Sequence, residues 1–143
     1  MLKNDHSLIH AAKVCVLCAV LAEELGLDIK ETLYLMFAAV VHDTGRENNS
    51  KDTEHGVRST WNLIYSMDEV VYDIVRNHSR ADRRMGYFDE DRNKFLTKVF
   101  KDADALDRVR TGDLDESKLR FNESKKLIEF ARRLHECLLT AQD

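Results

Sequence analysis

Apolar side chains recur every three or four residues along most of the chain, and short polar stretches separate these segments, a pattern that predicts helices. The first segment begins at Asp5 or Ser7 and runs to about Leu25, with Gly26 just past its end as a helix-terminating residue. It is apolar on nearly every side, so we expect this helix to lie in the centre of the core.

Five further helices follow from the same periodicity, with Asp28 as the expected cap of the first of them. They are expected over residues 28–43, 53–66, 68–78, 91–108 and 116–140. The last one is amphipathic and is expected to close the core, and part of its face could bind a second copy of the chain. The pattern therefore predicts an all-α fold, a compact bundle of about six helices with short connections.

Composition supports the same fold and narrows the setting. A length of 143 residues suits one domain, and the absence of proline with only five glycines favours helix. No run of 18 apolar residues predicts a membrane span, and the first residues lack the features of a secretory signal. Three cysteines fit a reducing cytoplasm, and Cys15 and Cys18 are expected to pack in the core. A net charge of −4 argues against an extended nucleic-acid surface.

Titratable side chains fall on the apolar stripes of several predicted helices. His10 and His78 each extend a stripe of buried aliphatic residues, and His42-Asp43 closes an apolar helix. Polar groups of this kind need partners when buried, and a shared metal ion can satisfy several of them at once. Nitrogen and carboxylate ligands suit Zn, Mn, Fe or Co better than a metal that prefers thiolates.

Periodicity leaves other candidates open. Asp102 and Asp104 flank the buried face of the helix over 91–108 on opposite sides, and Asp107 lies nearer the middle of that face. His55 lies opposite the apolar positions of its own helix, so the pattern does not direct it into the core. His135 stands among charged residues and is expected at the surface.

Three ordered elements resemble those of the HD-domain superfamily of metal-dependent phosphohydrolases. They are His6-Ser-Leu-Ile-His-Ala-Ala-Lys-Val14, Val40-Val-His-Asp-Thr-Gly-Arg46 and Lys101-Asp-Ala-Asp-Ala-Leu-Asp107. The match selects His10 over His6 and Asp104 over Asp102. The resemblance covers about residues 6–108 and implies a single HD domain over residues 1–143.

The resemblance also implies a ligand set and a cofactor. His55 and His78 are similar to two further elements of HD proteins with a dinuclear centre, in which Asp43 bridges two ions. The implied metal ligands are His10, His42, Asp43, His55, His78 and Asp104, with Asp43 and Asp104 as the catalytic residues. The implied cofactor is a divalent transition metal (Mn, Fe, Co, Zn or Ni), as one or two ions, with Mg also possible.

The activity that the resemblance implies is hydrolysis of a phosphate ester or anhydride, in a nucleotide-like small molecule, by metal-activated water. Arg46, Arg80 and Arg84 are the expected phosphate contacts because a guanidinium donates two parallel bonds to phosphate. Asp107 is expected either to orient a ligand or to contact the substrate. The alternatives are a di-iron oxygenase of the HD type and a non-catalytic, metal-binding regulatory module. The chain is expected to act as a monomer or a homodimer.

Overall fold

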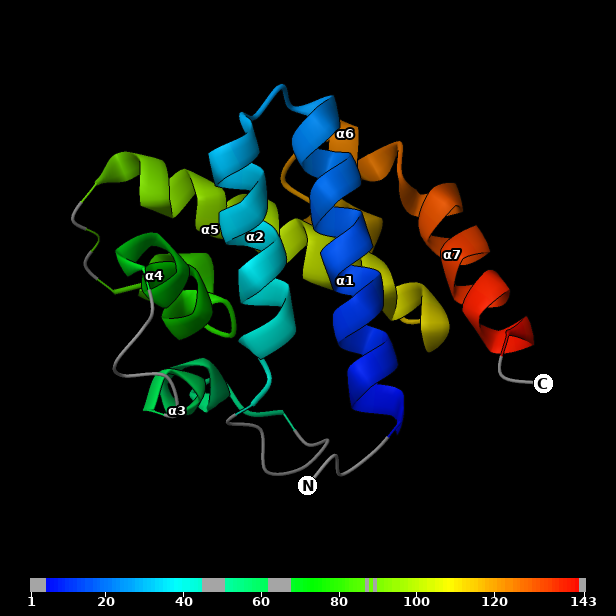
Figure 1. Cartoon of the computed structure of the whole chain (residues 1–143), viewed down its shortest axis with the longest axis horizontal. Helices are drawn as coiled ribbons and strands as arrows, with labels where there is room; N and C mark the ends of the chain where they lie inside the picture. Colours follow the sequence, from blue (N-terminus) through cyan, green and yellow to red (C-terminus); the bar gives the residue numbers. More distant parts are fainter. Residues whose placement is uncertain (1–4, 45–50, 62–67, 87, 89, 142–143) are drawn as a thin grey trace.

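The computed structural model describes residues 5–44, 51–61, 68–86, 88 and 90–141 of the chain (Figure 1). These residues form seven α-helices and no strand, which confirms the predicted all-α fold. The helices are α1 (Asp5–Glu24), α2 (Ile29–Val41), α3 (His55–Trp61), α4 (Glu69–Asn77), α5 (Asp91–Leu106), α6 (Asn122–Lys125) and α7 (Ile128–Thr140). Three short 3-10 helices accompany them: η1 (Asp82–Arg84), η2 (Asp107–Arg110) and η3 (Glu116–Lys118). Within the described ranges, none of these helices has the length and apolar character needed to cross a membrane.

Helices α1 and α2 form an antiparallel hairpin that a glycine makes possible. Gly26 adopts a left-handed φ of +69°, and its N–H donates to the carbonyl of Glu23 at 3.1 Å, while Leu27 donates to Ala22 at 2.9 Å. This pair of bonds satisfies the last carbonyls of α1 and reverses the chain. Asp28 then caps α2 with its side chain, so two long helices lie side by side (Figure 1).

The core forms where α1, α2, α4 and α5 pack on one another. Their buried faces are aliphatic with one aromatic ring: Val14, Leu17, Leu21, Leu35, Ala38, Ile74, Val75, Leu96, Phe100 and Leu106. Helix α3 packs on α4, and α7 packs on α1 and η2. The helix ends that carry the candidate histidines and aspartates therefore belong to elements in mutual contact.

The first helix contributes to the core, as expected from its apolar residues, but it is not buried on every side. Neighbouring helices cover the side of α1 that carries Val14, Leu17 and Leu21, whereas Leu8 and Val16 are exposed. The apolar character of this helix therefore overstates how much of its surface is buried.

The expected helix over residues 116–140 is interrupted, and the reason is a tertiary contact. The fully buried carboxylate of Asp102 accepts hydrogen bonds from the backbone N–H groups of Arg120 (2.9 Å) and Phe121 (3.1 Å) and from the hydroxyl of Ser124 (2.7 Å). These bonds hold the chain extended between η3 and α6 and use donors that a continuous helix would direct to its own carbonyls. Residues 62–66 of the helix expected over 53–66 lie outside the described residues.

Candidate metal centre

Five helices bring titratable side chains to one place in the bundle. His10 lies in the first half of α1, and His42-Asp43 follows the last turn of α2. His55 begins α3, His78 follows α4, and Asp104 lies in the last turn of α5. The six side chains that the resemblance implies as metal ligands are therefore adjacent in space.

Four donor atoms surround one point between α1, α2 and α5. The Nε2 of His10 lies 3.3 Å from the Nε2 of His42 and 3.1 Å from the Oδ1 of Asp104. The Oδ2 of Asp43 lies 3.3 Å from His42 Nε2 and 3.5 Å from His10 Nε2. Bonds of about 2.1 Å to one ion separate neighbouring donors by about 3.0 Å in an octahedral site and about 3.4 Å in a tetrahedral one. This first donor group has the spacing of a metal site.

A second donor group lies against the other oxygen of Asp43. The Nε2 atoms of His55 and His78 are 2.8 Å apart. The Oδ1 of Asp43 lies 3.0 Å from His55 Nε2 and 3.8 Å from His78 Nε2. The two carboxylate oxygens of Asp43 thus face different histidine pairs, which is the arrangement of a carboxylate able to bridge two ions.

The ring orientations of three histidines follow from their own backbones. Each Nδ1 lies 2.6 or 2.7 Å from the carbonyl oxygen three residues earlier, with His42 on Ala39, His55 on Asp52 and His78 on Val75. Because a carbonyl only accepts, each Nδ1 carries a proton, so in the neutral ring the lone pair that can bind an ion is on Nε2. The turn at each helix end therefore selects the tautomer that can bind a metal.

His10 is oriented differently, by a carboxylate. Its Nδ1 lies 2.6 Å from the Oδ2 of Asp107, which also accepts from Arg110 at 3.0 Å. The other oxygen of Asp107 forms an ion pair with the Nζ of Lys13 at 2.9 Å. With only 1% of its side chain exposed, Asp107 stands behind His10. Its contact with the Nδ1 of His10 favours the expectation that it orients that ring.

The placement of His55 differs from what periodicity indicated, because His55 begins its helix and Gly56 lets that helix approach α4. A Cβ on Gly56 would clash with the backbone oxygens of Val75 and Arg76. The hydroxyl of Ser59 also donates to the backbone oxygen of His42 at 2.7 Å and ties α3 to the end of α2. His55 is buried as a result. The signal available in the sequence was the glycine directly after the histidine.

Two further residues of this region were missed or misplaced by pattern reasoning. His135 was expected at the surface, but it is half-buried and its Nδ1 accepts a hydrogen bond from the ammonium of Lys13 at 2.9 Å. Lys13 is only 2% exposed. The signal was a lysine one turn after His10 on the same apolar stripe, since a buried ammonium requires partners.

The remaining candidates fall into three groups. Asp104, not Asp102, faces the donor cluster, so the structure separates the two acids that periodicity left open. Arg80 forms an ion pair with Glu54 at 3.0 Å, and Arg84 is exposed on η1. Arg46 lies outside the described residues.

The two cluster carboxylates are held in their charged form. Burial by itself would raise the pKa of Asp43, but hydrogen bonds led by that from His55 hold the pKa well below its ordinary value. Asp104 shows the same balance, since the nearby charge of His42 outweighs burial and its pKa lies well below the usual range. Two ionised carboxylates in a buried site favour a cation.

The histidines of the two donor groups differ in their pKa. Burial disfavours the charged form of His10, but hydrogen bonds to Asp104 and Asp107 outweigh it and raise the pKa of His10 to about 9. Burial instead lowers the pKa of His78. The shifts of His10 and His78 therefore have opposite directions.

A comparison with protein families agrees with this geometry. The family model described as the HD domain matches residues 8–109, which is more than half of the chain. The chain therefore belongs to the HD-domain family, within a superfamily of metal-dependent hydrolases whose HD domains bind divalent metal ions. Searches of curated proteins and of solved structures found no match. The donor chemistry fits such an ion, because His10, His42 and Asp104 form one group that could hold it and His42, Asp43 and His78 form another.

Proposed function

We propose that the protein is a metal-dependent phosphohydrolase that cleaves a phosphate ester or anhydride of a small, nucleotide-like molecule and uses two ions. The observation that carries this proposal is the position of Asp43, because its two carboxylate oxygens lie against separate donor groups. Divalent ions bound there supply hydroxide near neutral pH and neutralise charge on a phosphoryl oxygen.

The chain's own residues would bind the ions and leave one side of the centre open. His10, His42 and Asp104 would hold one ion and His55 and His78 the other, with Asp43 shared. His42 and His78 have only 1% of their side chains exposed, whereas Asp43 has 25% and Asp104 has 29%. The carboxylates therefore mark the open side, from which a phosphate would approach, while the buried rings exclude water from the other side.

Arginines would supply the remaining phosphate contacts. Arg80 forms an ion pair with Glu54, the residue before His55 in the chain, and this contact supports its place in the proposal. A substrate phosphate would exchange with the Glu54 carboxylate for the same donors. Arg84, exposed on η1, and Arg46 belong to the same proposal.

The test is phosphate release by the purified protein loaded with Mn²⁺ or Co²⁺. The panel comprises nucleoside mono-, di- and triphosphates, cyclic nucleotides and dinucleotides. We expect at least one class to be hydrolysed and Asp43→Ala to abolish the activity, while the matched control Asp91→Ala, on the exposed start of α5, retains it. An ion-loaded wild type that releases no phosphate from any of them would contradict the proposal. Consumption of oxygen by an iron-loaded form would favour the oxygenase instead.

A further inference from the structure

One histidine of the cluster has an ionic support and the other three do not. His42, His55 and His78 rest on backbone carbonyls, which the local helix turn holds in place. His10 rests on the carboxylate of Asp107, a side chain with rotational freedom of its own. A carboxylate partner fixes a ligand ring and raises its basicity only as long as the carboxylate itself is held.

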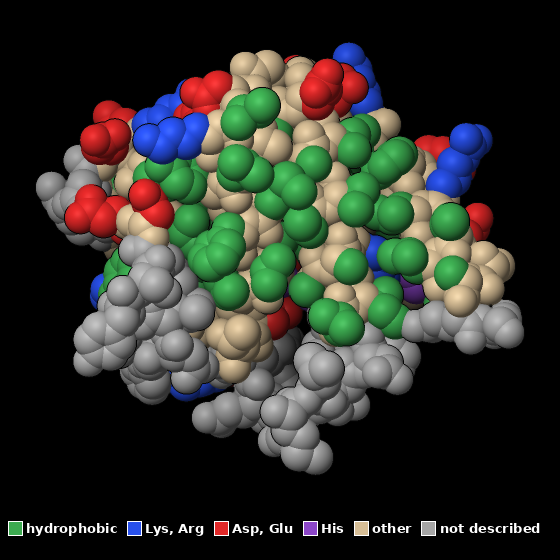
Figure 2. Space-filling model, viewed as in Figure 1, with side chains coloured by type: hydrophobic (Ala, Val, Ile, Leu, Met, Phe, Trp, Pro, Cys, Tyr) green, Lys and Arg blue, Asp and Glu red, His purple; other side chains and the backbone are tan. Residues whose placement is uncertain are grey.

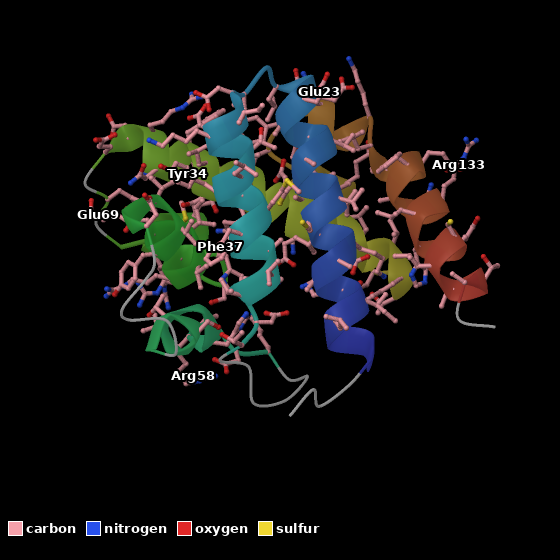
Figure 3. The ribbon with its side chains drawn as sticks, viewed as in Figure 1. Glu23, Tyr34, Phe37, Arg58, Glu69 and Arg133 are labelled. Atoms are coloured by element: carbon pink, nitrogen blue, oxygen red, sulfur yellow. The ribbon has the colours of Figure 1, made fainter. Side chains whose placement is uncertain are left out.

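Asp107 is held by a buried chain of contacts that ends on α7. The Lys13 ammonium lies 2.9 Å from Asp107 Oδ1 and 2.9 Å from His135 Nδ1. An ammonium only donates, so His135 accepts through Nδ1 and carries its proton on Nε2. Helix α7 lies beyond residues 8–109, the part of the chain that the HD-domain model matches. Figure 3 shows α7, marked by Arg133, running alongside α1.

We propose that His135, Lys13 and Asp107 are positioning residues for His10, through which α7 sets the affinity of the first donor group for its ion. The second donor group, with its backbone supports, is independent of α7. This inference rests on the proposed function, because it takes the two donor groups as ion sites.

The physical reason is that water does not reach Lys13 and Asp107. Lys13 and Asp107 are 2% and 1% exposed, so an ammonium that loses its His135 acceptor cannot replace it with solvent and shifts onto Asp107. That shift changes the angle at which Asp107 holds the Nδ1 of His10, and the Nε2 lone pair moves off the ion position. Loss of a supporting partner of this kind typically weakens metal affinity by about 10–100-fold.

The experiment measures the two steps of Co²⁺ binding by calorimetry and by the visible absorption of the bound ion. His135→Phe keeps an aromatic ring but removes the hydrogen-bond acceptor. We expect it to lower the affinity for one ion several-fold and to leave the affinity for the other unchanged. His135→Gln keeps an acceptor for Lys13 and is expected to restore binding. Asp107→Asn should give the larger loss, about 10–100-fold, again for one ion. The control is Arg133→Leu, an exposed change on α7 that should alter neither step.

The outcomes separate the two proposals. A wild-type protein that binds no ion contradicts the proposed function. A wild type that binds two ions, with His135→Phe binding both as tightly, overturns the role of α7 and leaves the proposed function intact. An equal loss of affinity for both ions in His135→Phe also overturns it, since a general destabilisation of the fold would have that effect. Circular dichroism shows whether each variant is folded, and His135→Gln supplies the comparison if His135→Phe is not.

A different observation concerns the outward face of α1 and α2, where hydrophobic side chains gather (Figure 2). Large apolar residues recur at helical spacing along it and are between 39% and 79% exposed: Leu8, Val16, Ile29, Leu33, Phe37 and Val40. We call these six residues the α1–α2 face. Three of them, Leu33, Phe37 and Val40, also line a pocket of about 520 Å³ together with Tyr34 and Val71. Tyr34 and Phe37 are labelled in Figure 3.

The exposed area is close to what a dimer uses. If a large side chain offers about 150–250 Å² when fully exposed, the α1–α2 face presents roughly 600 Å² of apolar surface. That is at the upper end of the largest apolar patch on a typical monomer, about 300–600 Å², and a stable interface buries about 800 Å² on each partner. The exposed charged residues of α1 and α2 include both signs, with Glu23 and Lys30 among them, unlike the basic face of a helix that lies on a membrane.

We infer that a second copy of this chain covers the α1–α2 face through a two-fold axis. A two-fold contact pairs one face with itself, so a single apolar patch is sufficient. Because Phe37 lies within the face, a charge placed there is buried twice in each dimer.

The test is mass in solution, by light scattering and sedimentation over a range of concentrations. We expect a dimer for the wild type, a folded monomer for Phe37→Glu, and a dimer for the control Leu139→Glu, which changes an exposed apolar residue on α7. A wild type that remains monomeric at every concentration overturns the inference, and so does a dimer that Leu139→Glu alone dissociates. A monomer that sediments with phosphatidylcholine vesicles overturns it in favour of lipid.

Discussion

The two donor groups share Asp43 but are constructed from different parts of the molecule. The first group joins α1, α2 and α5, helices of the core, and its His10 is supported by a buried network of charged side chains. The second group lies at the ends of α3 and α4, and backbone carbonyls orient both its histidines. One half of the centre therefore depends on charged side chains that are distant from His10 in the sequence. The other half depends on how closely two short helices approach each other.

The largest effect is expected for the residue that the halves share. Asp43→Asn keeps the shape of the side chain but removes the negative charge that faces both histidine pairs. We expect the protein to lose both ions and at least about 10³-fold in phosphate release, because each ion loses an anionic ligand. Metal analysis after dialysis and an activity assay measure the two losses. Retention of two tightly bound ions would show that Asp43 does not link the halves.

Removing one ring from the second group should separate the halves. His78→Ala deletes a ligand whose side chain contacts His55 and Asp43. Its ring also packs against that of His42, with 5.0 Å between the centroids. We expect one ion to remain and one to be lost, as measured by calorimetric stoichiometry. The matched change in the first group is Asp104→Ala, which should spare the other ion. If either variant loses both ions, or if the wild type never binds more than one, the halves are not separate sites.

The close approach of α3 to α4 can be disturbed without touching a ligand. A Cβ on Gly56 would meet the backbone oxygens of Val75 and Arg76, so Gly56→Ala should push His55 away from its partner. We expect destabilisation of about 1–3 kcal/mol in urea unfolding and weaker binding of the second ion only. Gly86→Ala is the control, because a Cβ there meets the end of the flexible Arg80 side chain at 3.3 Å. Unchanged affinity for both ions in Gly56→Ala would argue against a role for this contact.

The smallest effect is a difference in pH dependence between the halves. An ion in the first group must displace the proton of His10, whose pKa is raised to about 9, so its apparent affinity should rise by up to about tenfold per pH unit between pH 6.5 and 9. Burial lowers the pKa of His78, so this ring should add no such pH dependence to binding of the second ion over that range. Titration calorimetry in buffers of different ionisation heat counts the released protons. Identical pH profiles for the two ions would contradict the assignment.

The same shift bears on the stability of the ion-free protein. A raised folded-state pKa means that the contribution of His10 is fully present below its unfolded value of 6.5. It is lost as pH rises through about 9. Thermal unfolding of the ion-free protein should therefore move to lower temperature over that interval, and bound ions should reduce the change.

Features that depend on one helix and its own burial could be predicted from the sequence alone. The apolar periodicity predicted the all-α fold, and the position of His10 and His78 on apolar stripes predicted that both face inward, where the structure has them. The cap at Asp28 and the helix end at Gly26 were also predicted from the sequence and are confirmed. Each of these rests on contacts within a few residues, which local sequence encodes directly.

Features that depend on which helices meet were decided by the tertiary structure. Asp102 and Asp104 flank the same helix face, so periodicity does not distinguish them. In the folded chain Asp102 binds the 119–124 segment, whereas Asp104 contacts His10. His55 points inward because Gly56 admits α3 to the end of α4. Periodicity reports which side of a helix is buried but not what it is buried against. The hydrogen bonds that join His10 to Asp107 and Lys13 to His135 could therefore be identified only from the folded chain.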